Sequence, residues 1–170
     1  HVKVSGLAAA VPVNAVDNAQ NPLLSDLERE KFIKTVGIRY RRVAPKGVTS
    51  SDLCYEAARK LIEALQWKPE EIDFLVYVTQ TPDYFIPNTA SVLQQRLQLH
   101  KNCMAFDVNL GCSGYVYGLS IAGSLLQNKP KGKALLLVGD VSTAVVSPKD
   151  KSTQPLFSDA GSATALEFAL

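Results

Sequence analysis

The most informative stretch of the sequence is Phe106-Asp107-Val108-Asn109-Leu110-Gly111-Cys112-Ser113-Gly114-Tyr115-Val116-Tyr117-Gly118. Its first residues continue an alternation of larger apolar side chains with smaller or polar ones that begins at Met104, which predicts a β-strand. The chain then turns through Asn109-Leu110-Gly111, and an apolar segment with helical spacing follows to about Leu126. The pattern therefore places Cys112 where a strand passes into a helix.

Three glycines lie within or just before the expected helix, at positions 114, 118 and 123. A glycine in a helix costs about 1 kcal/mol relative to alanine, because its backbone loses more conformational freedom. A helix that contains three of them is expected to pack tightly against other backbone. We therefore expect this helix to be buried, with Cys112 at its N-terminus.

The expected position of Cys112 has a chemical consequence. The first turn of a helix offers unpaired N–H groups and about half a positive charge, which stabilise a thiolate and can receive an oxyanion. Cysteine is also among the most frequently buried residue types, and a buried thiol is usually inert. The local pattern alone leaves a nucleophile and a core residue both open.

Composition excludes several classes of protein. The 170 residues suffice for one domain with its own core, and 46% hydrophobic with 20% charged residues is ordinary for a globular protein. A net charge of +2 gives no argument for nucleic acid, and no apolar run is long enough for a membrane span. The cysteines at 54, 103 and 112 match no metal-binding or disulfide pattern, which favours a reducing, cytoplasmic setting. Cys54 lies on the apolar side of an expected helix and Cys103 just before an expected strand, and both are expected in the core.

The remaining elements follow from periodicity and capping signals. A first helix is expected from Ser25 to Gly37, because Ser25 and Glu28 have capping-box spacing. Two more helices are expected, over Thr49–Trp67 and from Asn88 or Thr89 to Leu97. Strands are expected near 2–12, 74–79, 134–138 and 165–170. This alternation predicts an α/β fold with a mostly parallel sheet and helices on both faces.

Four segments together resemble a known family. The stretch around Cys112 is similar to the nucleophile segment of β-ketoacyl-acyl carrier protein synthase III, of the thiolase superfamily. The other three are Val36–Arg42, Phe74–Thr79 with the following Pro82 and Pro87, and Phe157–Ala163. The matches occur in family order and span nearly the whole chain. Because the family fold has two similar α/β halves, the resemblance implies that residues 1–170 are the N-terminal half.

The resemblance also implies a mechanism. Cys112 would take an acyl group from a thioester, and the carbanion formed by decarboxylation of malonyl-acyl carrier protein would then attack the acyl-enzyme. The family supplies a histidine and an asparagine for the second stage, both from the second half. We therefore expect this polypeptide alone to be unable to condense substrates.

The family pattern assigns further positions. Phe32 corresponds to a tryptophan that stacks on adenine, and Lys151 to an arginine near the phosphate end of coenzyme A. Ile86 falls at a residue that shapes the acyl pocket across the dimer, and Phe157 near the gate to the acyl tunnel. A basic cluster is read either as a solvated face or as a docking site for acyl-coenzyme A or acyl carrier protein; it contains Lys34, Arg39, Arg41, Arg42 and Lys46. Coenzyme A would be a substrate, and no separate cofactor and no metal are expected.

The resemblance implies a homodimer, and the apolar loop Tyr84-Phe85-Ile86 would contribute to its interface. Two other functions stay open. One is a specialised acyltransferase or condensing enzyme of the same superfamily, and the other is a non-catalytic dimerisation or binding module that keeps only the fold. A generic nucleotide-binding domain is disfavoured, because no glycine-rich phosphate loop follows the first strand.

Overall fold

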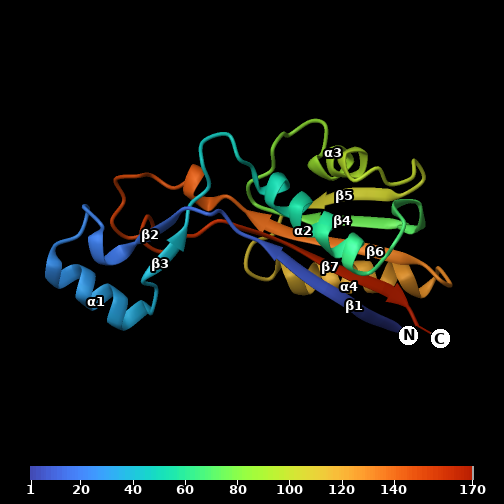
Figure 1. Ribbon diagram of the computed structural model, residues 1–170, viewed down its shortest axis with the longest axis horizontal. Coiled ribbons are helices and arrows are strands. Elements are labelled where there is room, and N and C mark those ends of the chain that lie inside the picture. Colours follow the sequence, from blue (N-terminus) through green and yellow to red (C-terminus); the bar gives the residue numbers. More distant parts are fainter. Residues whose placement is uncertain (170) are drawn as a thin grey trace.

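The computed structural model describes residues 1–169 and contains a five-stranded sheet with helices on both faces (Figure 1). The strand order is β1-β7-β6-β4-β5. The strands are β1 (Val2–Ala10), β4 (Phe74–Val78), β5 (Met104–Val108), β6 (Lys133–Asp140) and β7 (Ala160–Phe168). The expected strand over 165–170 is therefore the second half of a longer one, and Leu170 lies outside the described residues.

The sheet is mixed. Strand β4 pairs in parallel with β5 and β6, as expected, whereas β7 runs antiparallel to both β6 and β1. A parallel pair needs a crossover that returns the chain to the start of the sheet. Residues 141–159 contain only the 3-10 turn η3 (Ser142–Ala144) and no α-helix, so β7 begins at the end of the sheet where β6 stops.

The two faces of the sheet carry different helices. Along β4, Leu75 and Tyr77 belong to a core with α2 (Ser50–Ala64) and α3 (Thr89–Arg96), while Val76 and Val78 belong to a core with α4 (Gly114–Gln127). This alternation is the period of two that a strand imposes on its side chains. Every residue from Leu75 to Val78 is at most 1% exposed, because both faces of β4 are covered.

Helix boundaries agree with the capping signals. Helix α1 (Asp26–Val36) has the expected capping box of Ser25 and Glu28, and it ends at Gly37, which has φ 79°. Helix α2 begins after Thr49 but ends at Ala64, three residues before the expected end at Trp67. Gln66 adopts a left-handed conformation with φ 54°, which is incompatible with a continuing helix.

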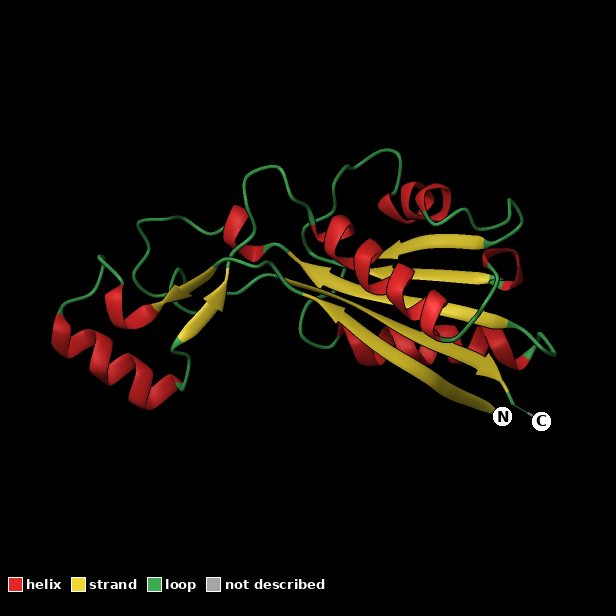
Figure 2. Ribbon diagram, in the orientation of Figure 1, coloured by secondary structure: helices red, strands yellow, loops and turns green. Residues whose placement is uncertain are grey.

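Helix α1 lies away from the sheet, in a projection with the two-stranded ribbon β2 (Ala15–Asp17) and β3 (Tyr40–Arg42) (Figure 2). This ribbon lies in segments that the sequence patterns left as loops. Leu27 is 77% exposed, and no residue of α1 is fully buried. The reason is that α1 packs mainly against the 3-10 turn η1 (Asn18–Gln20) and has no sheet beneath it.

Helix α4 buries one stripe and exposes another. Gly114, Gly118, Ala122 and Leu126 face the sheet, whereas Val116 and Tyr117 are 67% and 57% exposed. The expectation of a buried helix is therefore wrong for this chain, in which only the sheet-facing side of α4 is covered. No helix within residues 1–169 is long and apolar enough to cross a lipid bilayer.

Candidate active site

The site lies at one end of the sheet. Strands β4, β5 and β6 are parallel, so their carboxyl ends meet at the same edge, which faces the projection that carries α1 (Figure 1). The segments leaving these ends are 79–81, 109–113 and 140–144, and β7 enters the sheet beside them at Ala160. Ligands of α/β proteins bind at such edges, because the loops there converge from several strands.

The turn that carries Cys112 is short. Strand β5 ends at Val108, whose carbonyl accepts a 3.1 Å hydrogen bond from Leu110 N, and α4 begins at Gly114, whose N–H donates to Gly111 O over 2.8 Å. Cys112 is exposed, two residues before the helix. The Ser113 side chain does not cap the start of α4, so among the described residues no side-chain cap occupies the N–H groups that follow Gly114 in the first turn.

The other two cysteines are core residues, as expected. Cys54 is 0% and Cys103 5% exposed, and in each case burial raises the pKa of the thiol to about 12. A thiol with such a pKa is protonated near neutral pH and is a poor nucleophile. All three cysteines are free, and Cys112 alone is exposed. The structure therefore separates one accessible thiol from two inert ones.

A carboxylate that the sequence did not single out organises the edge. Asp140, at the end of β6, accepts hydrogen bonds from Gln80 N at 2.7 Å, from Thr79 Oγ1 at 2.9 Å and from Thr81 N and Oγ1 at 3.0 Å, all on Oδ1. Thr81 Oγ1 also accepts from Val141 N at 3.0 Å. These bonds hold the exit of β4 against the exit of β6. The available signal was an aspartate directly after an apolar strand.

Asp159 organises the entry to β7 in a similar way. Its side chain is completely buried and accepts hydrogen bonds from Ala44 N at 2.7 Å and from Thr143 N and Oγ1. It joins the segment after β3 to the 3-10 turn after β6. The sequence pointed to this residue only as part of the family-like segment Phe157–Ala163.

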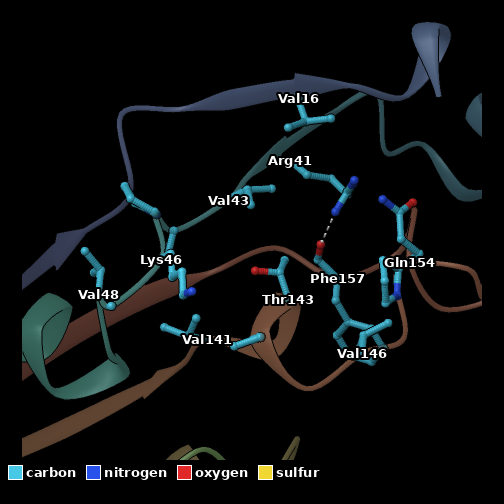
Figure 3. Close-up of a pocket in the computed structure, with 15 residues that line it drawn as sticks. Val16, Arg41, Val43, Lys46, Val48, Val141, Thr143, Val146, Gln154 and Phe157 are labelled. Carbon is cyan, nitrogen blue, oxygen red and sulfur yellow. Dashed lines mark hydrogen bonds between the residues drawn. The ribbon is translucent and has the colours of Figure 1, made fainter. Parts of the chain in front are cut away.

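Phe157 lines a cavity of about 510 Å³ between the segment that follows β3 and the loop that follows β6 (Figure 3). Its walls are largely apolar, with Val43, Val141 and Val146 among them, and Lys46 contributes an ammonium group. The cavity is thus suited to a mostly apolar group. Cys112 is not among the residues that line this cavity.

The expected basic cluster is divided in the structure. Arg41 is 3% exposed, and its guanidinium donates to Asn18 Oδ1 at 3.1 Å. It also donates to Phe157 O at 3.0 Å, the bond drawn in Figure 3. Burial lowers the pKa of Arg41, and the Asp159 charge opposes that effect. Arg42 donates to two carbonyls, Pro12 O and Val13 O, and Arg39 pairs with Asp17 at 3.5 Å. Buried Arg41 is therefore not available to a docking surface, whereas the exposed members that lack an ion pair among residues 1–169 are Lys34, Arg42 and Lys46.

Lys151 and Phe32 lie in one neighbourhood. Lys151 Nζ is 3.4 Å from Glu28 Oε2, which links the 147–157 loop to the start of α1. Phe32 is one turn further along α1 than Glu28, on the same side of the helix, and is half-buried. Hydrogen bonds from Ser25 and from Lys151 lower the pKa of Glu28. The carboxylate thus stays ionised and partly neutralises the lysine.

Ile86 belongs to a different surface. It is 89% exposed, beside Phe85 at 98% and Tyr84 at 57%, in the loop between β4 and α3. The Ile86–Pro87 peptide bond is cis. Within residues 1–169 no group of three or more histidine, cysteine, aspartate or glutamate side chains has the arrangement of a metal site.

In fold and sequence the chain is similar to condensing enzymes of the 3-oxoacyl-[acyl-carrier-protein] synthase III kind. The family model described as 3-Oxoacyl-[acyl-carrier-protein (ACP)] synthase III matches residues 106–169. A β-ketoacyl-[acyl-carrier-protein] synthase III of Rhizorhabdus wittichii is 36% identical over 96% of this chain and 51% of its own length. A β-ketoacyl-[acyl-carrier-protein] synthase III of Neisseria meningitidis is 32% identical over 99% of this chain and 53% of its own length.

Solved structures agree with these sequences. The 3-oxoacyl-(acyl-carrier protein) synthase of Burkholderia xenovorans superposes with a TM-score of 0.96 at 39% identity, over 99% of this chain and 49% of its own. AbyA1, a tetronic acid condensing enzyme, has a TM-score of 0.88 at 29% identity over 100% of this chain and 54% of its own. The chain is related to 3-oxoacyl-[acyl-carrier-protein] synthase III along its described length, and it spans about half the length of these relatives.

Proposed function

We propose that residues 1–170 are the N-terminal half of a 3-oxoacyl-acyl carrier protein synthase III-like enzyme and that Cys112 is its nucleophile. The observation that carries the proposal is the exposed thiol of Cys112 at the start of α4, on the carboxyl edge of a sheet whose solved relatives are condensing enzymes. Free N–H groups at a helix start stabilise a thiolate and the oxyanion of an acyl-transfer intermediate.

The proposed reaction has two stages. The Cys112 thiolate attacks the carbonyl carbon of an acyl thioester, and the carrier leaves as a thiolate, so that the acyl group is held on the enzyme. Malonyl-acyl carrier protein then loses carbon dioxide, and the resulting carbanion attacks the acyl-enzyme and releases Cys112 as a thiolate. The histidine and asparagine that the family uses in the second stage come from its other half, so residues 1–170 alone should load substrate poorly and form no ketoacyl product.

Two regions are proposed to receive the acyl donor. Lys151 makes an ion pair with Glu28, and Phe32 is one turn further along the same helix, which supports a joint role at the adenine and phosphate end of acyl-coenzyme A or at the phosphopantetheine arm of acyl carrier protein. Phe157, on the wall of the 510 Å³ cavity, is proposed to contact the apolar part of the acyl donor. A lysine supplies charge but lacks the bidentate geometry of the arginine in the family pattern.

The decisive experiment is mass spectrometry of the whole protein after incubation with a panel of acyl thioesters. We expect an added acyl mass on the peptide containing Cys112 and its absence in Cys112→Ser. Acylation of a different residue, or of none across the panel, contradicts the proposal. The same panel tests the alternative of a specialised condensing enzyme, a class to which the more distant structural neighbour AbyA1 belongs, because the acyl mass found on Cys112 identifies the accepted group.

The donor site has its own matched pair of variants. Lys149 and Lys151 lie in the same loop, but only Lys151 makes an ion pair with Glu28. We expect Lys151→Ala to raise the KM for acyl-coenzyme A about tenfold, as loss of one charged phosphate contact does, and Lys149→Ala to leave it nearly unchanged. Equal effects of the two substitutions would indicate general electrostatic attraction in place of a specific contact.

The whole protein is further proposed to be a homodimer in which the Tyr84-Phe85-Ile86 loop contacts the partner. The support is the exposure of three consecutive bulky apolar side chains, which is costly in water unless another surface covers them. A cytoplasmic location is likewise a proposal, and it is supported by three free cysteines.

A further inference from the structure

Gln80 lies directly against the turn that carries Cys112. A methyl group built on Gly111 would be 2.5 Å from Gln80 Oε1, 2.9 Å from its Cδ and 3.2 Å from its Nε2. All three terminal atoms of the amide thus lie within contact distance of one side of Gly111. The backbone of Gly111 is not among the positive-φ glycines, so the position requires glycine for space and not for a left-handed conformation.

The backbone of Gln80 is fixed from two sides. Gln80 N donates to Asp140 Oδ1 at 2.7 Å, and the preceding residue continues the pairing of β4 with β5 through Thr79 N and Val108 O at 3.2 Å. Thr79 and Thr81 make further bonds to the same oxygen of Asp140. The sheet edge therefore fixes the backbone of Gln80, whereas its side chain is exposed and makes no hydrogen bond to another described residue.

The register of the sheet explains how the contact arises. Val78 of β4 pairs with Val108 of β5 in parallel, so Gln80 and Gly111 leave neighbouring strands two and three residues further on. Glycine is the residue with the greatest backbone freedom, and Gly111 directly precedes Cys112. A side chain packed on this glycine restricts movements of the turn that would displace the thiol.

We propose that Gln80 is a positioning residue for Cys112, and that Gly111 is glycine because the Gln80 amide occupies the space of a side chain there. The proposal rests on the role of Cys112 as the nucleophile. A displacement of about 1 Å at a reacting atom can reduce a rate about a hundredfold, so loss of this contact is expected to affect reactivity more than stability.

The test is a double-mutant cycle on the whole protein with Gln80→Ala, Gly111→Ala and the double variant. The readouts are the second-order rate of Cys112 alkylation by iodoacetamide over a range of pH, the rate of acyl loading, and the urea midpoint of unfolding. Alkylation requires no acyl substrate, so it reports on the turn even if no thioester of the panel is accepted.

We expect each single variant to slow alkylation of Cys112 about tenfold, because the contact between the amide and the turn is lost or displaced. The urea midpoint should change little, because Gln80 is exposed and lies outside the core. In the double variant, the methyl group introduced at position 111 takes the space that the amide vacated. We therefore expect the double variant to react at least about fivefold faster than Gly111→Ala alone.

Gly123→Ala is the matched control, because a methyl group at Gly123 meets nothing within 4 Å, and it should leave the alkylation rate unchanged. The positioning role of Gln80 is overturned if the rate reduction in the double variant equals the product of the two single reductions, which indicates independent effects. It is also overturned if Gln80→Ala reacts as fast as the wild type, and both results leave the proposed function intact. A wild-type Cys112 that does not react at all overturns both.

Discussion

The chemistry assigned to this chain depends on which of its three thiols reaches solvent. Cys54 is enclosed between α2 and the strands β6 and β7, where a methyl group on Gly139 would lie 2.7 Å from its sulfur. Cys103 is nearly as buried, just before β5. Cys112 differs from both because it stands on a turn at the open edge of the sheet.

We predict that iodoacetamide labels Cys112 alone in the native protein. Burial keeps Cys54 and Cys103 inaccessible, and a pKa of about 12 keeps them protonated. Intact-mass and peptide mass spectrometry should show one label under native conditions and three in urea. Labelling of Cys112 no faster than that of the two buried cysteines in the whole protein would favour a non-catalytic module that keeps only the fold.

Asp150 gives a pH-dependent prediction. Hydrogen bonds from Thr153 and Ser152 lower the pKa of this carboxyl from 3.8 to about 2. A group whose pKa is lower in the folded state stabilises the fold above its ordinary value and loses that contribution as the pH falls through the folded value. Asp150→Asn should therefore lower the urea midpoint near neutral pH, and the difference should shrink between pH 3.8 and 2. A difference that grows on acidification would contradict this assignment.

Among the helices, α4 shows how the glycines of one element have different roles. A methyl group on Gly118 would lie 2.5 Å from Leu136 Cδ1 and 3.1 Å from Val78 Cγ2, and one on Gly114 would lie 2.5 Å from Val78 Cγ1. These contacts are with side chains of the sheet and not with other backbone, which corrects the expectation from sequence. The missing side chains let α4 approach β4 and β6 closely and bring the start of the helix to the edge where Cys112 lies.

Two substitutions in α4 should therefore have opposite effects. Gly118→Ala is expected to destabilise the protein by about 1–3 kcal/mol, because the added methyl group overpacks the interface with Leu136. Gly123→Ala is expected to stabilise it by about 0.5–1 kcal/mol through helix propensity. Urea denaturation with a common m-value measures both, and equal effects would show that α4 is not packed as described.

The molecule as a whole has one well-covered sheet and several apolar surfaces left open. Val4 and Leu7 of β1, Met104 of β5 and Val116 of α4 are each more than half exposed. The chain spans about half the length of its relatives, so these surfaces agree with the proposal that further chain packs on this half. The loop with Phe85, which connects β4 to α3, is a separate exposed surface.

The proposed dimer gives a prediction for the whole protein. Phe85→Asp places a charge on a side chain that is 98% exposed here, so the fold of the subunit should tolerate it while an apolar interface should not. Light scattering at high protein concentration should give a dimeric mass for the wild type and a lower average mass for the variant. A monomeric wild type contradicts the proposed dimer, and Leu27→Asp, on the exposed helix α1, serves as the matched control.

Much of this architecture could be read from the sequence, because its signals are local. The capping box at Ser25, the stop at Gly37, the apolar strand at β4 and the strand-to-helix passage at Cys112 depend on neighbouring residues only. Other features depended on residues far apart in the chain. The antiparallel β7, the β2–β3 ribbon, the burial of Arg41 and the converging bonds on Asp140 arise only when distant segments meet. Backbone propensity and periodicity act within a few residues, whereas the direction of a strand and the partner of a buried charge depend on the segments that pack against them. The sequence therefore specified where Cys112 lies along the chain, and the tertiary structure decided what surrounds it.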